Sequence, residues 1–180
     1  CLELLGAVID RKEGEWIVSG VGEEGFKTPQ QNLDCGNSGT SARFLMAIAA
    51  GMSEEIRIDG DESLRGRNMS AIAGALRELG CFVSGDTLPV TVSGPLQIDS
   101  ARLELSSSSQ PLSAILLASP GFPFPIKLET VGSSVSRGYY EMSFDIAEVC
   151  GSQNRFLHGA IDIKPWEVRV PEVVTISTED

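Results

Sequence analysis

Apolar residues along the chain recur with two periods, one typical of helices and the other typical of strands. Residues 40–50 are apolar on nearly every side, which predicts a helix that is buried all round. Between residues 68 and 79, apolar side chains recur at helical spacing, and Gly80 supplies a stop. Two strand-like runs, 81–85 and 89–94, follow this second helix. The alternation of strands and helices predicts an α/β fold.

The same order of elements returns after about 70 residues. Residues 33–51 (LDCGNSGTSARFLMAIAAG) align without a gap with residues 103–121 (LELSSSSQPLSAILLASPG), and later segments keep an offset of 70 or 71. A constant period of this size indicates a repeated unit, which reads as strand, helix, strand, helix, strand, strand. We therefore expect a single domain of βαβαββ units in four parts: a truncated first unit at 1–22, a second unit at 30–95, a third unit at 100–166 and a tail at 167–180.

Composition narrows the class of protein. The chain has 180 residues and a net charge of −11 with only 14 basic residues, which argues against general nucleic-acid binding. No apolar run approaches the ~18 residues of a membrane span, and neither a basic leader nor an initiator Met opens the sequence. The cysteines at 1, 35, 81 and 150 lack metal-site spacing, and His158 is the single histidine. We expect a cytoplasmic protein, or a fragment of one, with reduced cysteines that are buried or half-buried and with no metal site.

Polar loops precede four of the predicted helices. They are residues 36–43, 60–69, 106–111 and 133–142. Because equivalent loops of a repeat lie side by side, their hydroxyl, amide and guanidinium groups are expected to meet. Helix N-termini attract anions, so the four loops together predict a site for a polyhydroxylated, phosphorylated small molecule.

Each loop taken alone also has an ordinary structural explanation. Ser109 is equally well interpreted as an N-cap, Arg43 as the partner of an acid in the next layer, and Tyr139 as a residue that packs at a helix start. Three carboxylates in these turns are interpreted as caps or solvated charges: Asp34, Asp61 and Glu62.

Four motifs, in this order, resemble the successive signatures of the 5-enolpyruvylshikimate-3-phosphate (EPSP) synthase family: LDCGNSGTSARFL, GDESLRGRNM, SSSSQPLSAILLASP and VSRGYYEM. The resemblance implies the inside-out α/β barrel of enolpyruvyl transferases, in which two domains of three βαβαββ units enclose a cleft. This chain would be most of the N-terminal domain. The implied reaction transfers the enolpyruvyl group of phosphoenolpyruvate to the 5-hydroxyl of shikimate 3-phosphate, in aromatic amino acid biosynthesis. No cofactor takes part, and the partners are the two substrates and the second domain.

The resemblance also assigns roles to residues. Shikimate 3-phosphate would be held by Ser108, Ser109, Gln110, Ser136 and Tyr139. Phosphoenolpyruvate would be held by Asn37, Gly39, Thr40, Arg67 and Gln110. Supporting roles fall to Arg43, Arg65 and Arg137. A planar guanidinium suits two anionic oxygens better than a lysine does, which agrees with the role given to Arg67.

The chain departs from the family pattern at three of these motifs. Asn68 and Gly138 stand where the family usually has Pro, and Pro111 stands where it usually has an aromatic residue. Gly138 loosens the start of the helix that would present Tyr139. The family's N-terminal Lys-Ser motif and the acidic, lysine and arginine residues of its second domain are absent, so we expect this chain alone to be inactive.

Two alternatives stay open at this point. The sister transferase that acts on UDP-N-acetylglucosamine shares the fold and the donor, although it lacks the Ser-Ser-Gln and Ser-Arg-x-Tyr motifs. A half-domain that binds ligands without catalysis is the second alternative.

Overall fold

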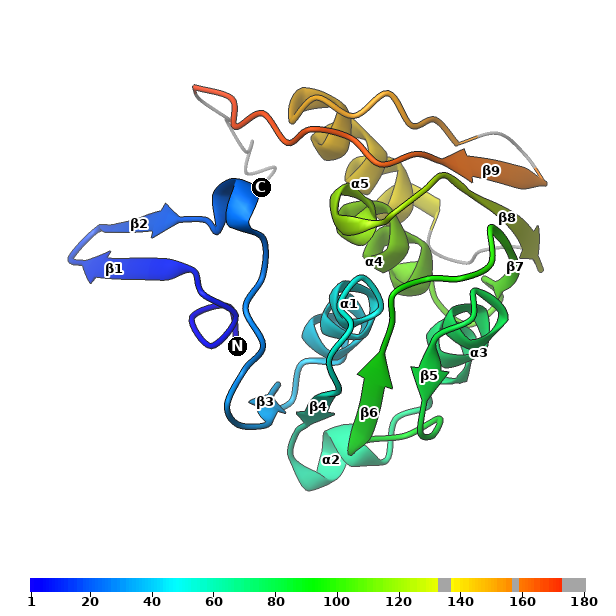
Figure 1. Cartoon of the computed structure of the whole chain (residues 1–180), viewed down its shortest axis with the longest axis horizontal. Coiled ribbons are helices and arrows are strands. Elements are labelled where there is room, and N and C mark those ends of the chain that lie inside the picture. Colours follow the sequence, from blue (N-terminus) through cyan, green and yellow to red (C-terminus); the bar gives the residue numbers. More distant parts are fainter. Residues whose placement is uncertain (133–136, 157–158, 173–180) are drawn as a thin grey trace.

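The computed structural model describes residues 1–132, 137–156 and 159–172 (Figure 1). Its strands fall into three groups, each a separate sheet. The first group is a hairpin of two antiparallel strands, β1 (Val8–Lys12) and β2 (Glu15–Ser19). A short 3-10 helix, Gly22–Glu24, and an extended segment connect this hairpin to the body of the molecule. The body contains two further sheets with the longer helices between them.

The two sheets of the body are built in the same way. The second group runs in chain order as β3 (Leu33–Asp34), α1 (Gly39–Ala49), β4 (Ile56–Asp59), α2 (Glu62–Arg65), α3 (Ser70–Glu78), β5 (Phe82–Val83) and β6 (Val90–Ser93). The third group runs as β7 (Ser100–Glu104), α4 (Gln110–Ala118), a 3-10 helix (Ser119–Gly121), β8 (Ile126–Val131), α5 (Arg137–Val149) and β9 (Ala160–Ile163).

The strand order of the sheets confirms the repeated topology. The second group orders its strands β3-β4-β6-β5, with β3 parallel to β4 and the other pairs antiparallel. The third group orders its strands β7-β8-β9, again with the first pair parallel and the next antiparallel. In each group the parallel pair is joined through a helix, as a crossover connection requires. The expected α/β fold is confirmed.

The helices form the interior and the sheets lie outside them. Apart from Gln110 and Leu117, every residue of α4 is buried, because this helix is almost wholly apolar. Helix α4 packs against α1 on one side and α5 on another, and α3 packs against β7. Along β7 (Ser100–Glu104), Ala101 and Leu103 are buried, and the other three residues are exposed. Because of this alternation, the sheet that contains β7 turns its apolar face to the helices and its polar face to solvent.

Both helices predicted in the second unit are present. The helix expected at 40–50 is α1, whose first turn is capped by Ser38 Oγ accepting from Ser41 N at 3.1 Å. The helix expected at 68–79 is α3, which begins later because Asn68 Oδ1 accepts from Ser70 N at 2.6 Å and so acts as a turn. Gly80 ends it with φ of 87°, a conformation that favours glycine.

Two features of the elements differ from the sequence-based expectation. The short helix α2 occupies a stretch expected to be a turn, and Asp61 caps it by accepting from Leu64 N at 2.8 Å. In the third unit, the first of the two strands expected after α5 is absent from the described residues 150–156 and 159. There the Asn154 side chain bonds the backbone of Lys164, donating to its carbonyl at 3.0 Å and accepting from its N–H at 2.8 Å. The Asn154 side chain thus makes the two backbone hydrogen bonds that a neighbouring strand would make in a sheet.

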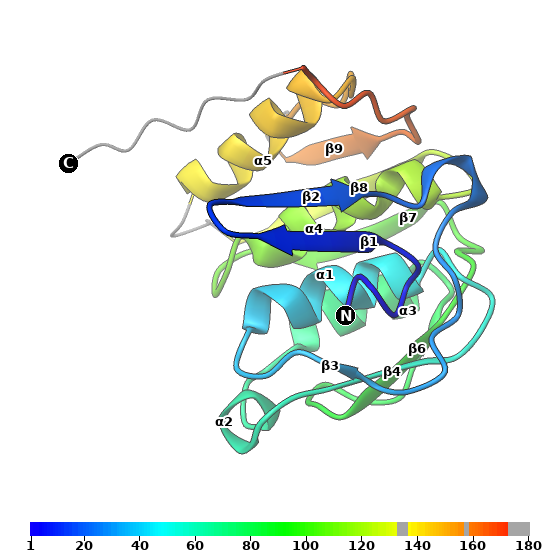
Figure 2. The ribbon, with the colours of Figure 1, turned by 90° about the vertical axis from the view of Figure 1, so that its left-hand side faces the viewer.

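The cysteines are free thiols, as expected, but one of them is not buried. Cys35 and Cys81 are buried and Cys150 is half-buried, which confirms the expectation for these three. Cys1 is exposed, and the expectation is wrong there; the start of the chain lies below β1 on the face that Figure 2 turns to the viewer. The Sγ of Cys1 lies 3.0 Å from the carbonyl of Asp34.

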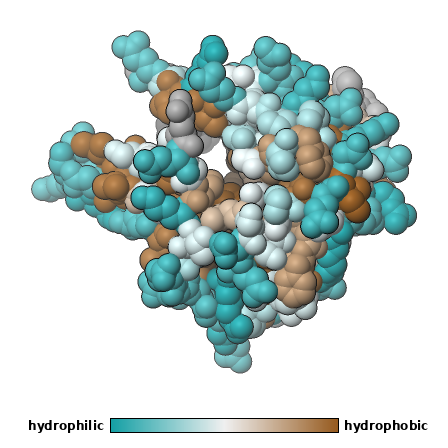
Figure 3. Space-filling view, viewed as in Figure 1, coloured by the Kyte–Doolittle hydropathy of each residue, from teal (hydrophilic) through white to brown (hydrophobic). Residues whose placement is uncertain are grey.

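Apolar residues reach the surface on the N-terminal hairpin, at the left of Figure 3. Trp16 is 69% exposed, and Val8, Ile17 and Val18 are also exposed. Leu5, just before β1, is buried and its carbonyl accepts from Lys27 N at 2.9 Å. The hairpin is therefore attached to the body at its base while its strands remain uncovered.

Candidate functional site

The starts of three helices lie at one end of the molecule. In Figure 2, α1 and α5 both begin at the left-hand side. The start of α4 joins them there, because Gln110 at the first position of α4 is hydrogen-bonded to Arg43 in the first turns of α1. N–H groups in the first turn of a helix lack intrahelical acceptors and carry the positive end of the helix dipole. This end of the molecule is therefore suited to anions.

Arg43 holds these helix starts together. Its Nη1 donates to the carbonyl of Gly39 at 3.0 Å and to Gln110 Oε1 at 2.8 Å, and its Nη2 donates to the carbonyl of Asn68 at 2.9 Å. The side chain is half-buried, and its pKa is lowered first by burial and then by the positive charge of Arg67 nearby. Arg43 thus links α1, α4 and the start of α3 while adding charge to the site.

Arg67 is placed differently. It is exposed, and its Nη2 donates a short hydrogen bond to Asn37 Oδ1. Asn37 Nδ2 in turn donates to Asp61 Oδ2 at 2.8 Å. Within the described residues, the other N–H groups of Arg67 have no hydrogen-bond acceptor. They are therefore available to a ligand with anionic oxygens.

Gly39 allows the two guanidinium groups to approach the helix start. A Cβ atom built on Gly39 would lie 2.8 Å from Arg43 Nη1 and 3.2 Å from Arg67 Nη1. Any larger residue would displace one or both arginines. Thr40 follows in the first turn of α1 and is exposed. Asn37, Gly39, Arg43, Arg67 and Gln110 therefore form one cluster, as the alignment of the loops predicts.

The serine run before α4 reaches the same cluster through Gln110. Ser108 Oγ accepts from Gln110 N at 3.1 Å. Ser109 is 3% exposed and occupies the N-cap position, but its side chain makes no capping hydrogen bond. The interpretation of Ser109 as an ordinary N-cap is therefore not supported, and Ser108 takes over the capping contact. Pro111 in the first turn removes one N–H that would otherwise lack an acceptor.

Two of the predicted supporting arginines are engaged with acids. Arg65 forms a two-pronged ion pair with Asp59, with Nε to Oδ1 at 2.8 Å and Nη2 to Oδ2 at 2.7 Å. This contact lowers the pKa of Asp59 and raises that of Arg65. Arg137 pairs with Glu141 one turn later at 2.7 Å. Both arginines stabilise their own elements, and neither joins the cluster around Arg67.

Tyr139 lies in the first turn of α5 and is 66% exposed, so its ring does not pack at the helix start. Its carbonyl lies 3.0 Å from Ser143 Oγ, which in turn lies 2.8 Å from Ser113 Oγ on α4. The contact between Ser143 and Ser113 joins the middle of α5 to α4. Ser136, the other predicted ligand in this loop, lies outside the described residues.

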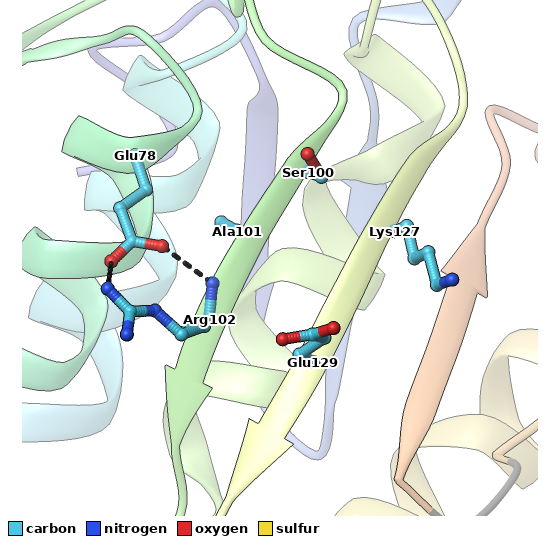
Figure 4. Close-up of a pocket in the computed structure, with 6 residues that line it drawn as sticks. All are labelled: Glu78, Ser100, Ala101, Arg102, Lys127 and Glu129. Carbon is cyan, nitrogen blue, oxygen red and sulfur yellow. Dashed lines mark hydrogen bonds and ion pairs between the residues drawn. The ribbon is translucent and has the colours of Figure 1, made fainter.

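A shallow hollow of about 240 Å³ lies elsewhere, on the outer face of the third sheet (Figure 4). Glu78 of α3 pairs there with Arg102 of β7 at 3.3 Å and accepts from its backbone N–H at 2.8 Å. Glu129 and Lys127 stand on the neighbouring strand β8. The hollow carries both signs of charge and contains no predicted site residue, so it is separate from the cluster at the helix starts.

Comparison with known proteins decides the family. The family model described as EPSP synthase (3-phosphoshikimate 1-carboxyvinyltransferase) matches residues 1–150. The chain belongs to the EPSP synthase family. Within this family it is 37% identical over 155 residues to the 3-phosphoshikimate 1-carboxyvinyltransferase of Methanococcoides burtonii, covering 84% of this chain and 36% of that protein. It is 33% identical over 180 residues to that of Paracoccus denitrificans, covering 94% and 41%.

A solved structure gives the same family. The EPSP synthase of Acinetobacter baumannii matches with a TM-score of 0.76 and 27% identity over 94% of this chain and 38% of that one. The chain thus spans about two fifths of the length of the EPSP synthases it matches. None of the helices in the described ranges has the length and hydrophobicity needed to cross a membrane. In the same ranges, no three His, Cys, Asp or Glu side chains are grouped to hold a metal ion.

Two participants in this EPSP synthase cluster were not expected from the sequence. Asp61 was interpreted as a cap or a solvated charge; the cap is confirmed, but its second oxygen also contacts Asn37. Asn68 contributes its backbone carbonyl to Arg43. The capping role of Asp61 can be predicted from the sequence, because an aspartate directly before the helix-forming residues Glu62–Leu64 is a common N-cap. Sequence carries no signal for the other two contacts, because they join residues 24 or more positions apart.

Proposed function

We propose that this chain forms the first-domain side of the active site of an EPSP synthase. The complete enzyme transfers the enolpyruvyl group of phosphoenolpyruvate to the 5-hydroxyl of shikimate 3-phosphate and releases phosphate. The single observation that carries the proposal is the geometry of Arg67. It is an exposed guanidinium with open donors, held by Asn37 beside the half-buried Arg43 and two helix starts.

Phosphoenolpyruvate carries a phosphate and a carboxylate, and both suit this cluster. Arg67 supplies charge and paired donors, while the N–H groups at the start of α1, around Gly39 and Thr40, supply the positive end of a helix. Gln110 is oriented by Arg43, which donates to its Oε1. Its Nε2 is therefore the group left to donate to a ligand. Asn37 completes the phosphoenolpyruvate side.

Shikimate 3-phosphate is proposed to bind along the starts of α4 and α5. Ser108, Ser109 and Gln110 would hold it from one helix, and Ser136 and Tyr139 from the other. Two observations support this assignment: α5 is attached to α4 through Ser143 and Ser113, one turn after Tyr139, and the ring of Tyr139 is exposed. Arg43, Arg65 and Arg137 are proposed to support these loops without contacting the substrates.

The rest of the proposal concerns the whole protein. We propose that the chain consists of a truncated first unit at 1–22, a second unit at 30–95, a third at 100–166 and a tail at 167–180. The complete enzyme would act in the cytoplasm, with the two substrates and a second domain as partners. General acid and base groups must lie within hydrogen-bond reach of the reacting atoms. In the described part of the cluster the carboxylate present is that of Asp61, and both of its oxygens are occupied, by Leu64 N and Asn37. The isolated chain is therefore expected to bind substrate without turnover.

A matched pair of arginine variants tests the proposal. Arg67→Ala removes the open guanidinium, whereas Arg65→Ala removes a guanidinium two residues away that is occupied by Asp59. A charge-assisted hydrogen bond contributes about 1.5–3 kcal/mol, so Arg67→Ala should weaken phosphoenolpyruvate binding about 10- to 100-fold. Arg65→Ala should change it by less than about twofold, because the guanidinium of Arg65 is held by both carboxylate oxygens of Asp59 and, within the described residues, is not hydrogen-bonded to the cluster around Arg67.

The measurement is an NMR titration of the 180-residue chain with phosphoenolpyruvate, in the presence of shikimate 3-phosphate. Thermal unfolding of both variants serves as the control for folding. Equal loss of binding in the two variants would mean that only the overall charge matters. Unchanged binding in Arg67→Ala would remove Arg67 from the site.

A further inference from the structure

Asp61 makes two contacts, one with each carboxylate oxygen. Oδ1 accepts from Leu64 N at 2.8 Å and caps α2, and Oδ2 accepts from Asn37 Nδ2 at 2.8 Å. These two donors are the main reasons why the pKa of Asp61 is lowered, so the carboxylate stays ionised at neutral pH. Asp61 therefore joins the start of a short helix to the loop before α1.

The chemistry of the three side chains fixes the orientation of Asn37. An ionised carboxylate only accepts hydrogen bonds and a guanidinium only donates them. Asn37 must therefore turn its amide nitrogen to Asp61 and its amide oxygen to Arg67, as it does in the structure. The opposite orientation would set oxygen against oxygen and N–H against N–H, with both hydrogen bonds lost. Asp61 thus determines which atom of Asn37 faces Arg67.

We propose that Asp61 is a positioning residue for Arg67, acting through Asn37. This inference rests on the proposed function of Arg67 as the group that binds phosphoenolpyruvate. Asp61 need not touch the substrate. It holds the Asn37 amide so that Oδ1 points at Arg67, and the guanidinium is then directed into the site before the ligand arrives. A side chain that is oriented in advance loses less conformational entropy on binding.

No other described carboxylate can replace Asp61 in this role. Asp59 is occupied by Arg65, and Asp34 Oδ1 accepts from Gly36 N at 2.9 Å within its own turn. Neither of them forms a hydrogen bond with Asn37 or Arg67 within the described residues. Only Asp61 therefore connects a negative charge to Asn37 and Arg67.

Variants at position 61 separate capping from positioning. Asp61→Asn keeps the shape of the side chain, but it can cap α2 or accept from Asn37, not both, because one of its two atoms is now a donor. Asp61→Ser keeps a good N-cap but is too short to hold Asn37. Asp34→Asn is the matched control, since it also removes one carboxylate charge, at the end of β3 just before the loop that carries Asn37, and asparagine can still form the turn with Gly36.

The first readout is the guanidinium signal of Arg67 in the 180-residue chain labelled with ¹⁵N-arginine. In the unaltered chain, the Nη2 protons of Arg67 should be resolved, because their hydrogen bond slows rotation. Asp61→Asn and Asp61→Ser should each merge or shift these signals, and Asp34→Asn should leave them unchanged. Exchanging the two residues, Asn37→Asp with Asp61→Asn, restores a complete set of donors and acceptors and should restore the signals.

The second readout is the affinity for phosphoenolpyruvate in the presence of shikimate 3-phosphate. Loss of one oriented hydrogen bond should weaken it about three- to tenfold in both position-61 variants and by less than about twofold in Asp34→Asn. Unchanged Arg67 signals in the position-61 variants, or an equal effect of Asp34→Asn, would overturn the positioning role. If the unaltered chain does not bind phosphoenolpyruvate at all, the proposed function fails, while the Arg67 signals still decide the positioning role.

Discussion

At the scale of single residues, the availability of a charged side chain depends on its partner. Arg65 and Arg67 are separated by one residue, yet Asp59 occupies the first with two hydrogen bonds and only the amide of Asn37 holds the second. A carboxylate neutralises the charge of Arg65, whereas an amide leaves the charge of Arg67 free to act on a ligand. The motif GDESLRGRNM contains both arginines but does not show which of them is engaged by an acid. Their partners, Asp59 and Asn37, lie outside the motif and belong to different segments.

Cysteine reactivity is predicted at the same scale. Burial raises the pKa of Cys35 to about 11 and that of Cys81 to about 11, so at pH 8 only about one in a thousand of these thiols is ionised. Cys1 is exposed and should react with a thiol reagent such as DTNB within minutes, while Cys35 and Cys81 should react at least about 100-fold more slowly.

The control is the same chain in denaturant, where all four thiols should react together. Mass spectrometry of the labelled peptides identifies each site. Rapid labelling of Cys35 in the folded chain would contradict the burial of this thiol.

At the scale of elements, hydrophobic periodicity predicted the longer helices well because it reflects burial directly. The apolar helix α4 is almost wholly buried as expected, whereas α1 is buried at six of its eleven residues and exposed at Thr40 and Ser41. The offset of 70 predicted that the two helices belong to equivalent units. Periodicity was not sufficient for α2, which is a single turn held by Asp61, nor for the missing strand near Asn154. In both places hydrogen bonds from a single side chain to the backbone accompany the local conformation, and such contacts leave no periodic pattern.

The N-terminal hairpin should be the least protected part of the described structure. An isolated two-stranded hairpin is marginally stable in water, and nearly all side chains of β1 and β2 are exposed. Its visible supports are surface contacts, a pair between Arg11 and Glu3 at 2.7 Å and the guanidinium of Arg11 lying 5.3 Å from the Trp16 ring. Contacts of this exposed kind contribute little to stability.

Hydrogen–deuterium exchange tests this expectation. Peptides from β1 and β2 should exchange within seconds to minutes, whereas those from α4 should exchange only with global unfolding. Strands β5 and β6 provide the control, because they form a similar antiparallel pair that is joined to a larger sheet. A hairpin protected as strongly as α4 would mean that another surface covers it.

At the scale of the whole molecule, a repeated unit gathers equivalent helix starts at one end, and this arrangement creates the site. Three of the four loops that the sequence predicted to meet are joined by hydrogen bonds of Arg43 and Arg67, and the period of 70 residues is the reason, because it places equivalent turns side by side. The sequence could not predict the contacts within the cluster, such as Arg43 to Gln110 or Asn37 to Asp61, because they depend on how the units pack. Since the chain spans about two fifths of the EPSP synthases it matches, a one-sided site is the expected result.

We expect the starts of α4 and α5 to bind shikimate 3-phosphate, which an NMR titration of the 180-residue chain with this compound can detect. With contacts from one side only, the affinity should be weak, with Kd approaching the millimolar range. Backbone amides of residues 106–110 and 136–139 should shift first. The double variant Ser109→Ala with Ser136→Ala should lose these shifts and keep its fold. Ser106→Ala is the control and should retain the shifts, because the Ser106 hydroxyl is bonded to Glu104. Absence of shifts in these two loops, or equal shifts in the double variant, would contradict the account.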